Sequence, residues 1–301
     1  MPLKKLTILV LQYNKPYLTE RLLHSLCRHE AVDNYEVIIV DNNSTEPDRF
    51  NDFKIVFPHF SFIKNTENMG FARAINKEVK NLSKETPYLL LINNDIILNN
   101  NSIGLCLSAI EKLQADAVTC NMLHDDGNVI DNFSSDLSVL SFILLNLTGL
   151  SAIWRKYVRH KKTPSRIHYI NGAFLMMRLN RFKEVGLFTE DYFMYSEDKD
   201  LMFKLSRAAA RMYFIPGTNV VHSDGQSAAA VWNGQDKANM IVRQDVEVYA
   251  KYNTKAGLII LLWAWYLQQS IKYILFKDPV ALLYKRALAQ QLFKKDTVAA
   301  A

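Results

Sequence analysis

The sequence predicts an α/β protein in which a mostly parallel sheet is covered by helices on both faces. Short apolar runs alternate with segments whose apolar residues recur at helical spacing, as expected for that architecture. The most distinct run, residues 89–98, is interrupted by Asn93-Asn94-Asp95, and other runs also stop at amides and carboxylates. Ligands of open α/β sheets bind at the carboxyl ends of the strands. The polar strand ends are therefore the candidate functional site.

The composition is typical of a globular protein with one substantial core. The chain has 301 residues, is 49% hydrophobic and carries a net charge of +6. This mild charge gives no reason to expect a nucleic-acid partner, although residues 155–166 form a local basic cluster. Cys27, Cys106 and Cys120 fall in apolar patterns and are expected to be reduced core residues. The first residues lead into a strand without a signal-peptide pattern, which favours a cytoplasmic location.

Two buried strands and the helix between them open the chain. Apolar runs at 6–11 and 36–40 have the length of buried strands, and Pro16 marks the first turn of the intervening helix. No glycine-rich dinucleotide fingerprint follows the first strand and no Walker A sequence occurs, which disfavours dinucleotide-binding enzymes and P-loop NTPases. The polar residues at these two strand ends are Tyr13, Asn14, Asp41 and Asn43.

The alternation continues through the first half of the chain. A strand at 60–63 leads through Asn68 to Gly70, which permits a tight turn into a helix over 71–82. The start of such a helix presents free N–H groups to anions. The elements that follow are the interrupted strand at 89–98, a helix over about 102–114 and a strand over 117–122.

A second group of polar residues occurs in the later half of the chain. After an apolar stretch at 138–154 and a strand at 169–177, Glu197 and Asp198 begin a helix that Ser196 is expected to cap. The plainer explanation is that these carboxylates complement the helix dipole. His222 ends another apolar run, and a histidine at a strand end is a candidate metal ligand alongside Asp95.

The tail is predicted to be helical. The run at 257–267 is the most apolar in the chain, but it is shorter than the ~20 residues of a spanning helix. It is expected to lie at a membrane interface or to form an oligomer contact. The expected domains are a catalytic domain, residues 1–252, with a nucleotide-binding half (1–122) and an acceptor half (123–252), and a helical tail, residues 253–301.

An ordered set of motifs over about residues 5–250 resembles one family. It comprises Tyr13-Asn14, residues 40–44, residues 68–72, Asn93-Asn94-Asp95, residues 171–173, residues 193–201 and residues 222–227. Together they are similar to the GT-A glycosyltransferases of family 2, particularly the bacterial rhamnosyltransferase-like members that build cell-surface polysaccharides and O-antigens. The resemblance implies a GT-A fold and an inverting transfer from a nucleotide-sugar.

The resemblance also implies roles for single residues. Asp198 matches the catalytic base, and Glu197 is its neighbour, expected to orient the acceptor or the loop. Asp95 matches the last Asp of the family's D-x-D motif, which coordinates a divalent cation, Mn²⁺ or Mg²⁺, and His222 matches a position that completes the metal site in some members. The positions expected to bind the donor are Tyr13, Asn14, Asp41, Asn43, Asn68, Gly70, Asn93 and Asn94.

The chain departs from the family pattern at informative places. Asn93 replaces the first Asp of D-x-D, so the cation depends on Asp95 and His222. Residues 206–211 lack the glycine that usually follows the helix. The Q-x-x-R-W signature of processive synthases does not occur, which favours the transfer of one or a few sugars.

The donor expected from the resemblance is dTDP-L-rhamnose. Related enzymes use UDP-galactofuranose, UDP-N-acetylglucosamine or UDP-galactose, which remain alternatives. The expected acceptor is a glycan or lipid-linked glycan at the inner face of the cytoplasmic membrane, where the tail would hold the protein peripherally. A sugar nucleotidyltransferase is a rival, although it requires a glycine-rich loop where this chain has residues 12–16. A non-catalytic module for polysaccharide assembly is a third possibility.

Overall fold

The computed structural model describes residues 4–45, 49–82, 86–135, 137–223 and 234–293. The chain forms two compact units, and each is described by itself. The first contains residues 1–134 and 158–227, and the second contains residues 135–157 and 228–301. This division differs from the boundary expected at residue 252, because the helix α9 (Gly234–Tyr252) groups with the C-terminal helices.

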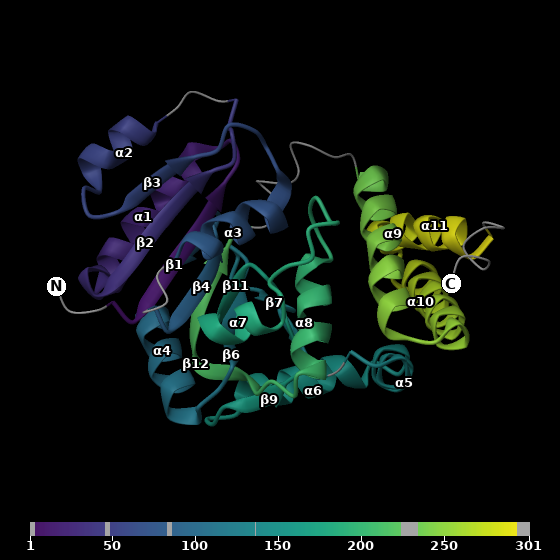
Figure 1. Cartoon of the computed structure of the whole chain (residues 1–301). Coiled ribbons are helices and arrows are strands. Elements are labelled where there is room, and N and C mark those ends of the chain that lie inside the picture. The colour runs from purple at the N-terminus through teal and green to yellow at the C-terminus, as the bar shows by residue number, and fades with distance from the viewer. Residues whose placement is uncertain (1–3, 46–48, 83–85, 136, 224–233, 294–301) are drawn as a thin grey trace. The chain divides into compact units, whose positions relative to one another are not determined.

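The first unit is built on one sheet, shown in Figure 1. Its strands in the described part of the chain are β1 (Leu6–Gln12), β2 (Tyr35–Asp41), β3 (Ser61–Lys64), β4 (Tyr88–Asn93), β5 (Ile96–Leu98), β6 (Ala117–Leu123), β7 (Val129–Ile130), β9 (Ser165–Ile167), β11 (Phe174–Arg178) and β12 (Met212–His222). Across the sheet the order is β3-β2-β1-β4-β11-β6-β12-β5, with β7 paired to β6 and β9 to β12.

The first four strands of that order run parallel, as the apolar runs predict. Their central side chains are fully buried; Ile8, Ile39 and Leu90 are each 0% exposed. The sheet becomes mixed beyond β4, because β11 runs antiparallel to both β4 and β6. The predicted α/β class is therefore confirmed, with antiparallel strands added in the second half.

Helices flank this sheet (Figure 1). They are α1 (Pro16–His29), the short 3₁₀ helix η1 (Val32–Asn34), α2 (Phe50–Val56), α3 (Gly70–Asn81), α4 (Ser102–Leu113), α7 (Leu179–Glu184) and α8 (Glu197–Arg207). The helix starts expected at Pro16 and Gly70 are confirmed. The helix start expected at Glu197 is confirmed too, but Ser196 adopts a left-handed φ of 63° and its side chain does not cap the helix.

Two further expectations are wrong in detail. The strand expected at 169–177 is two strands: β10 (Tyr169–Ile170) pairs with β8 (Phe133–Ser134) in a separate small sheet, and β11 joins the main sheet. Cys27 is exposed, whereas Cys106 and Cys120 are buried and all three are free thiols. Ala209 adopts a φ of 53° in the segment that lacks the family's glycine, a conformation that glycine takes without steric cost.

The second unit is helical. It contains α5 (Val139–Ser141), a π-helical turn η2 (Phe142–Leu147), most of α6 (Leu150–His160), α9, α10 (Lys255–Phe276) and α11 (Pro279–Phe293). Its core includes Val242, Leu258, Leu262 and Leu288. By length and composition alone α10 could cross a membrane, contrary to the sequence-based expectation, because the helix continues past Lys272 to Phe276.

Candidate active site

The ends of three neighbouring strands lie level at one edge of the first unit's sheet. The register places Asp41 of β2 beside Gln12 of β1, and Asn93 of β4 beside Leu11 of β1. The chain breaks between β4 and β5 at Asn94-Asp95. The convergence expected from the polar strand ends is therefore confirmed by the strand pairing.

Hydrogen bonds join the turns that follow β1 and β2. The Asn14 N–H donates to Ser44 Oγ at 2.7 Å, and the Thr45 N–H donates to Asn14 Oδ1 at 2.8 Å. Ser44 donates to Asp41 Oδ1 from both its N–H, at 3.1 Å, and its hydroxyl. These bonds fix the Asp41 carboxylate and the Asn14 amide in one rigid pair of turns.

Asn42, which was not among the predicted site residues, connects the next two segments. Its side chain is 2% exposed. Its Nδ2 donates to Asn68 Oδ1 at 2.8 Å and to the Gly70 carbonyl at 3.2 Å, and its Oδ1 accepts from Asn65 Nδ2 at 3.2 Å. Asn42 therefore holds the loop of Asn68 and Gly70 against the end of β2. In the sequence it is one of two adjacent amides, and no spacing distinguishes it from Asn43.

Gly70 allows the start of α3 to approach the segment before α8. It has a φ of 78°, and a Cβ added there would lie 2.3 Å from the Phe193 carbonyl oxygen. That oxygen accepts the Phe71 N–H at 2.9 Å. Any larger residue at position 70 would displace backbone, so the contact between α3 and the Glu197-Asp198 segment depends on this glycine.

The turn between β10 and β11 links the end of β4 to α8. The Asn93 N–H donates to the Ala173 carbonyl at 3.0 Å, and the Gly172 N–H donates to Asp198 Oδ2 at 3.2 Å. The adjacent residues Gly172 and Ala173 therefore connect Asp198 to the polar end of β4. The structure brings together Asn93 and Asp198, which are more than a hundred residues apart in the chain.

Three donors in the described part of the chain hold the Asp198 carboxylate. Oδ2 accepts the Tyr169 hydroxyl at 2.9 Å and the Gly172 N–H, and Oδ1 accepts the Lys199 N–H at 2.7 Å. Burial raises the pKa of Asp198 above its ordinary value, and the Tyr169 hydroxyl opposes that rise most strongly. A carboxylate with a raised pKa and one oxygen that accepts a single bond can serve as a general base. Sequence reasoning did not identify Tyr169 or Gly172 as its partners.

Asp95 and His222 meet where β5 pairs with β12. Asp95 Oδ1 lies 3.0 Å from His222 Nε2, with side-chain exposures of 4% and 13%. The Asp95 carbonyl also accepts the Ser223 N–H at 3.0 Å. The two predicted metal ligands are thus adjacent, while residues 224–227 of the same motif lie outside the described residues.

The Asp95-His222 pair fits a cation whose other ligands come from a bound phosphate group and water. Among the residues that the structure describes, no group of three His, Cys, Asp or Glu side chains could hold a metal ion. Mg²⁺ and similar cations in phosphate sites commonly use one or two protein ligands, and phosphate oxygens and water supply the rest. Asp95 and His222 suit that arrangement and not a site made entirely of protein ligands.

Two of the predicted site residues are buried. Asn94 is 5% exposed, and its Nδ2 donates to Thr19 Oγ1 of α1 at 3.2 Å. Glu197 is 8% exposed. Both positions favour a structural role in holding the strand end and the loop before α8.

Unusual backbone conformations concentrate at this edge. In the described part of the chain nine non-glycine residues have a positive φ. Five of them are in the turns after β1 and β2 and directly before α8: Asn14, Lys15, Asn43, Tyr195 and Ser196. Such strained positions cluster at functional sites. Tyr13, in the first of these turns, is half-buried.

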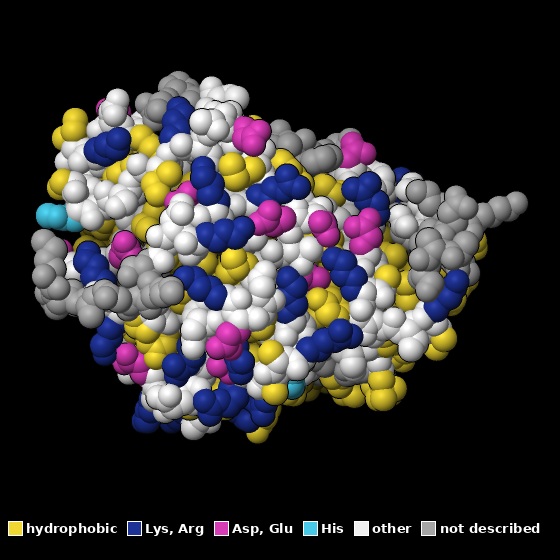
Figure 2. Space-filling model, viewed as in Figure 1, with side chains coloured by type: hydrophobic (Ala, Val, Ile, Leu, Met, Phe, Trp, Pro, Cys, Tyr) yellow, Lys and Arg dark blue, Asp and Glu magenta, His cyan; other side chains and the backbone are white. Residues whose placement is uncertain are grey.

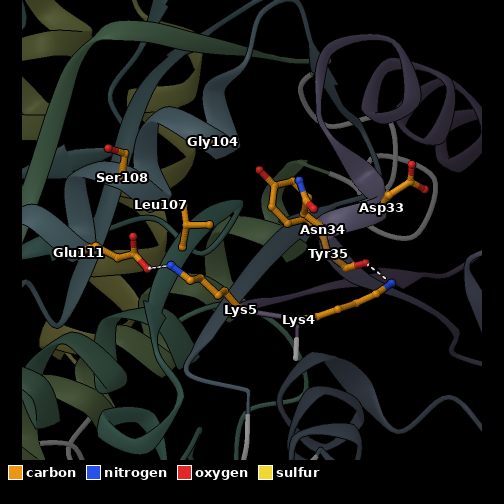
Figure 3. Close-up of a pocket in the computed structure, with 9 residues that line it drawn as sticks. All are labelled: Lys4, Lys5, Asp33, Asn34, Tyr35, Gly104, Leu107, Ser108 and Glu111. Atoms are coloured by element: carbon orange, nitrogen blue, oxygen red, sulfur yellow. Dashed lines mark hydrogen bonds and ion pairs between the residues drawn. The ribbon is translucent and has the colours of Figure 1, made fainter. Parts of the chain in front are cut away.

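A pocket of about 430 Å³ lies at the opposite edge of the sheet (Figure 3). Its lining includes Lys4 and Lys5, which precede β1, and Tyr35 at the start of β2. The Lys4 ammonium donates to the Tyr35 carbonyl at 2.7 Å, and Lys5 pairs with Glu111 at 3.1 Å. The pocket contains none of the predicted site residues.

A buried carboxylate in the same unit also lacks a catalytic arrangement. Burial raises the pKa of Glu30 to about 7. However, its two oxygens accept the N–H groups of Ile103 and Gly104 at 2.8 and 3.1 Å. Glu30 therefore caps the first turn of α4, which accounts for its burial without a catalytic role.

Comparison with known proteins identifies the family. The family description "Glycosyl transferase family 2" matches residues 7–186. The chain is 27% identical over 158 residues to Rhamnosyltransferase WbbL of Escherichia coli (strain K12), covering 52% of this chain and 59% of that protein. It is 24% identical over 232 residues to the N-acetylglucosaminyl-diphospho-decaprenol L-rhamnosyltransferase of Mycobacterium tuberculosis, covering 71% and 73%.

A solved structure shares the fold. The mannosyltransferase PcManGT from Pyrobaculum calidifontis, in complex with GDP-Man and Mn²⁺, superimposes with a TM-score of 0.57 at 16% identity, covering 98% of this chain and 84% of that one. The predicted GT-A fold is confirmed. Since the family match extends over more than half of the residues, from β1 through α7, the chain belongs to glycosyl transferase family 2.

Proposed function

We propose that this glycosyltransferase inverts the anomeric centre of its donor, with Asp198 as the general base. The observation that carries the proposal is the Asp198 carboxylate, held by Tyr169 and Gly172 beside the end of β4. The donor that we favour is dTDP-L-rhamnose, on the names of the two relatives, with UDP-sugars as the alternative. The family match favours transfer over the nucleotidyltransferase and non-catalytic alternatives.

In the proposed reaction, Asp198 removes the proton from the acceptor hydroxyl. Both lone-pair positions of Oδ2 are taken by Tyr169 and Gly172, whereas from the described residues Oδ1 accepts only the Lys199 N–H. Oδ1 is therefore the atom that receives the proton. The acceptor oxygen bonds to the anomeric carbon as the bond to the nucleoside diphosphate breaks, so one displacement inverts the configuration.

The donor occupies the polar strand ends in this proposal. Asp41 and Asn43 contact the base and ribose, and the turn that contains Asn68 and Gly70 lies near the diphosphate. Asp95 and His222 would hold a divalent cation, which neutralises the charge of the leaving diphosphate. Mn²⁺ is present with GDP-Man in the PcManGT structure, which has the same fold.

A thermal-shift titration tests the donor. We expect dTDP-L-rhamnose to raise the melting temperature in the presence of Mn²⁺ more than UDP-, GDP- or CMP-sugars do, because a ligand of the native state stabilises it by RT ln(1 + [L]/Kd), about 2.7 kcal/mol at 100 Kd. A rise with UDP-sugars alone would replace the proposed donor and leave the mechanism. Absence of a shift with every nucleotide-sugar, with and without metal, would contradict donor binding at this edge.

Tyr169→Phe tests the proposed positioning of the base through pH. The Tyr169 hydroxyl stabilises the ionised carboxylate, so its removal moves the pKa of Asp198 further upward. The active form is ionised, and activity is lost as the pH falls through that pKa. We therefore expect the acid limb of the kcat profile to move to higher pH in the variant.

The control for this test is Tyr213→Phe. Tyr213 pairs with Val118 and Arg166 at the amino end of β12, away from the edge that carries His222. Its profile should match that of the unchanged protein. A uniform loss of activity in Tyr169→Phe at every pH would mean that Tyr169 only maintains the fold.

A further inference from the structure

One face of α10 in the second unit is both apolar and exposed. Its residues recur at spacings of three and four, which places them on a single side of the helix. Their side chains are 40–59% exposed: Ile260, Trp263, Leu267, Ile271 and Ile274. The helix then ends at Leu275 and Phe276, which are 68% and 74% exposed.

A second apolar face occurs in the segment inserted from the middle of the chain. Leu140 and Leu144 are four residues apart, and Leu150, Ile153 and Tyr157 repeat at three and four; all are 48–67% exposed. Contacts of α5 and η2 with α10 place this segment in the same unit as the C-terminal helices. Figure 2 shows yellow side chains gathered over this part of the protein. Exposed apolar surfaces of this extent mark interaction sites.

Positive charge accompanies these apolar residues. Described residues 137–157 and 255–293 contain seven basic residues: Arg155, Lys156, Lys255, Lys272, Lys277, Lys285 and Arg286. The same ranges contain one acidic residue, Asp278, whose Oδ1 accepts the N–H groups of Val280 and Ala281 at the start of α11. The surface is therefore complementary to a partner that is apolar beneath an anionic layer.

The packing of α10 favours an interfacial orientation over a spanning one. Leu258 and Leu262 form a core with Val242 and Val246 of α9. The other positions of α9 include Asp236, Lys237, Arg243, Glu247 and Lys251, which could not accompany α10 into hydrocarbon. A helix packed on a charged helix along one face, and apolar along the other, lies in the plane of a membrane interface.

From these observations we propose that the second unit binds the surface of an anionic phospholipid membrane, with the exposed faces of α10 and of residues 140–157 inserted at the headgroup level. Trp263 and Tyr157 have amphipathic rings that suit this depth. Lys272 and Lys277 contact the anionic headgroups. This inference goes beyond sugar transfer and does not depend on it, because the surface consists of residues outside the candidate active site.

Cosedimentation with vesicles tests the proposal, using the full chain without donor or acceptor. We expect binding to phosphatidylglycerol-containing vesicles and weaker binding to phosphatidylcholine alone. Leu275→Glu should weaken binding roughly tenfold or more, because it replaces an inserted apolar side chain by a charge. Lys272→Gln and Lys277→Gln should each weaken it about fivefold, and only on anionic vesicles.

The matched control is Ile55→Glu, which changes an apolar side chain that is 80% exposed on α2 of the first unit. It should bind vesicles as the unchanged protein does, and circular dichroism should be the same for all variants. Three results would overturn the proposal: no cosedimentation, an equal loss in Ile55→Glu, or a dimer in sedimentation equilibrium that Leu275→Glu dissociates. Resistance of the membrane-bound protein to alkaline carbonate extraction would overturn the interfacial orientation.

Discussion

Asp198→Asn is expected to lower kcat by about 10²- to 10⁴-fold, the usual contribution of a general base. The amide cannot take the acceptor proton, while the size of the side chain is unchanged. Donor affinity should stay within about twofold, because the base acts on the acceptor and the donor is bound by the strand ends. Initial rates and a donor titration by thermal shift separate these two effects.

The same variant has a predictable cost in stability. Asp198 accepts hydrogen bonds on both oxygens, whereas an Asn side chain has one acceptor oxygen. One of the three donors therefore loses its partner, which costs about 1–3 kcal/mol. Asp191→Asn, an exposed carboxylate in the preceding loop, is the control and should retain activity within about twofold. Near-normal turnover of Asp198→Asn would show that another group is the base.

The carboxyl edge of the sheet was predictable from the sequence because each strand and its polar end are adjacent in the chain. Each parallel strand is a short apolar run, and its polar end follows directly in the chain, so the pattern locates Asp41, Asn93 and Asp95 without any knowledge of the pairing. The strand register then places Asp41 and Asn93 on either side of the end of β1. Only the sheet topology had to be assumed.

The partners of these residues were not predictable, because they are separated in sequence and have no periodicity. Tyr169 is 29 residues from Asp198, and its role requires the chain to turn at 171–173 instead of continuing as one strand. The Asn171-Gly172 pair is typical of a turn, but the prediction treated residues 169–177 as one strand. Asn42 was missed for a different reason, since three bonds to distant segments distinguish it from Asn43 and nothing in the sequence does.

The prediction at Ser196 located the start of α8 correctly but was wrong about how the helix is capped. Its position before Glu197 is typical of an N-cap, and the helix does begin there. However, Tyr195 and Ser196 both adopt left-handed conformations, with φ of 71° and 63°. The segment approaches Gly70 through Phe193, so tertiary contact determines the backbone at this point and overrides the local capping preference.

Asp95→Asn is expected to reduce kcat/KM by about 10²- to 10³-fold and to remove most of the metal dependence of donor binding. A cation that neutralises a leaving diphosphate contributes several kcal/mol, and a neutral amide binds it far more weakly than a carboxylate does. With Asn93 in the place of the first aspartate, Asp95 is the one carboxylate of that motif. Chelation by EDTA should reduce the unchanged protein to a similar level of activity.

Two comparisons separate this effect from a loss of folding. Asp116→Asn changes a carboxylate that is 13% exposed and paired with Arg181 at 3.5 Å, just before β6 at the other end of the strands. It should lower the melting temperature without altering the response to Mn²⁺. His222→Ala should weaken the metal response less than Asp95→Asn, because a neutral imidazole contributes no charge to the site. If Asp95→Asn binds the donor with the same metal dependence as the unchanged protein, the cation is held elsewhere and the contact between Asp95 and His222 only joins β5 to β12.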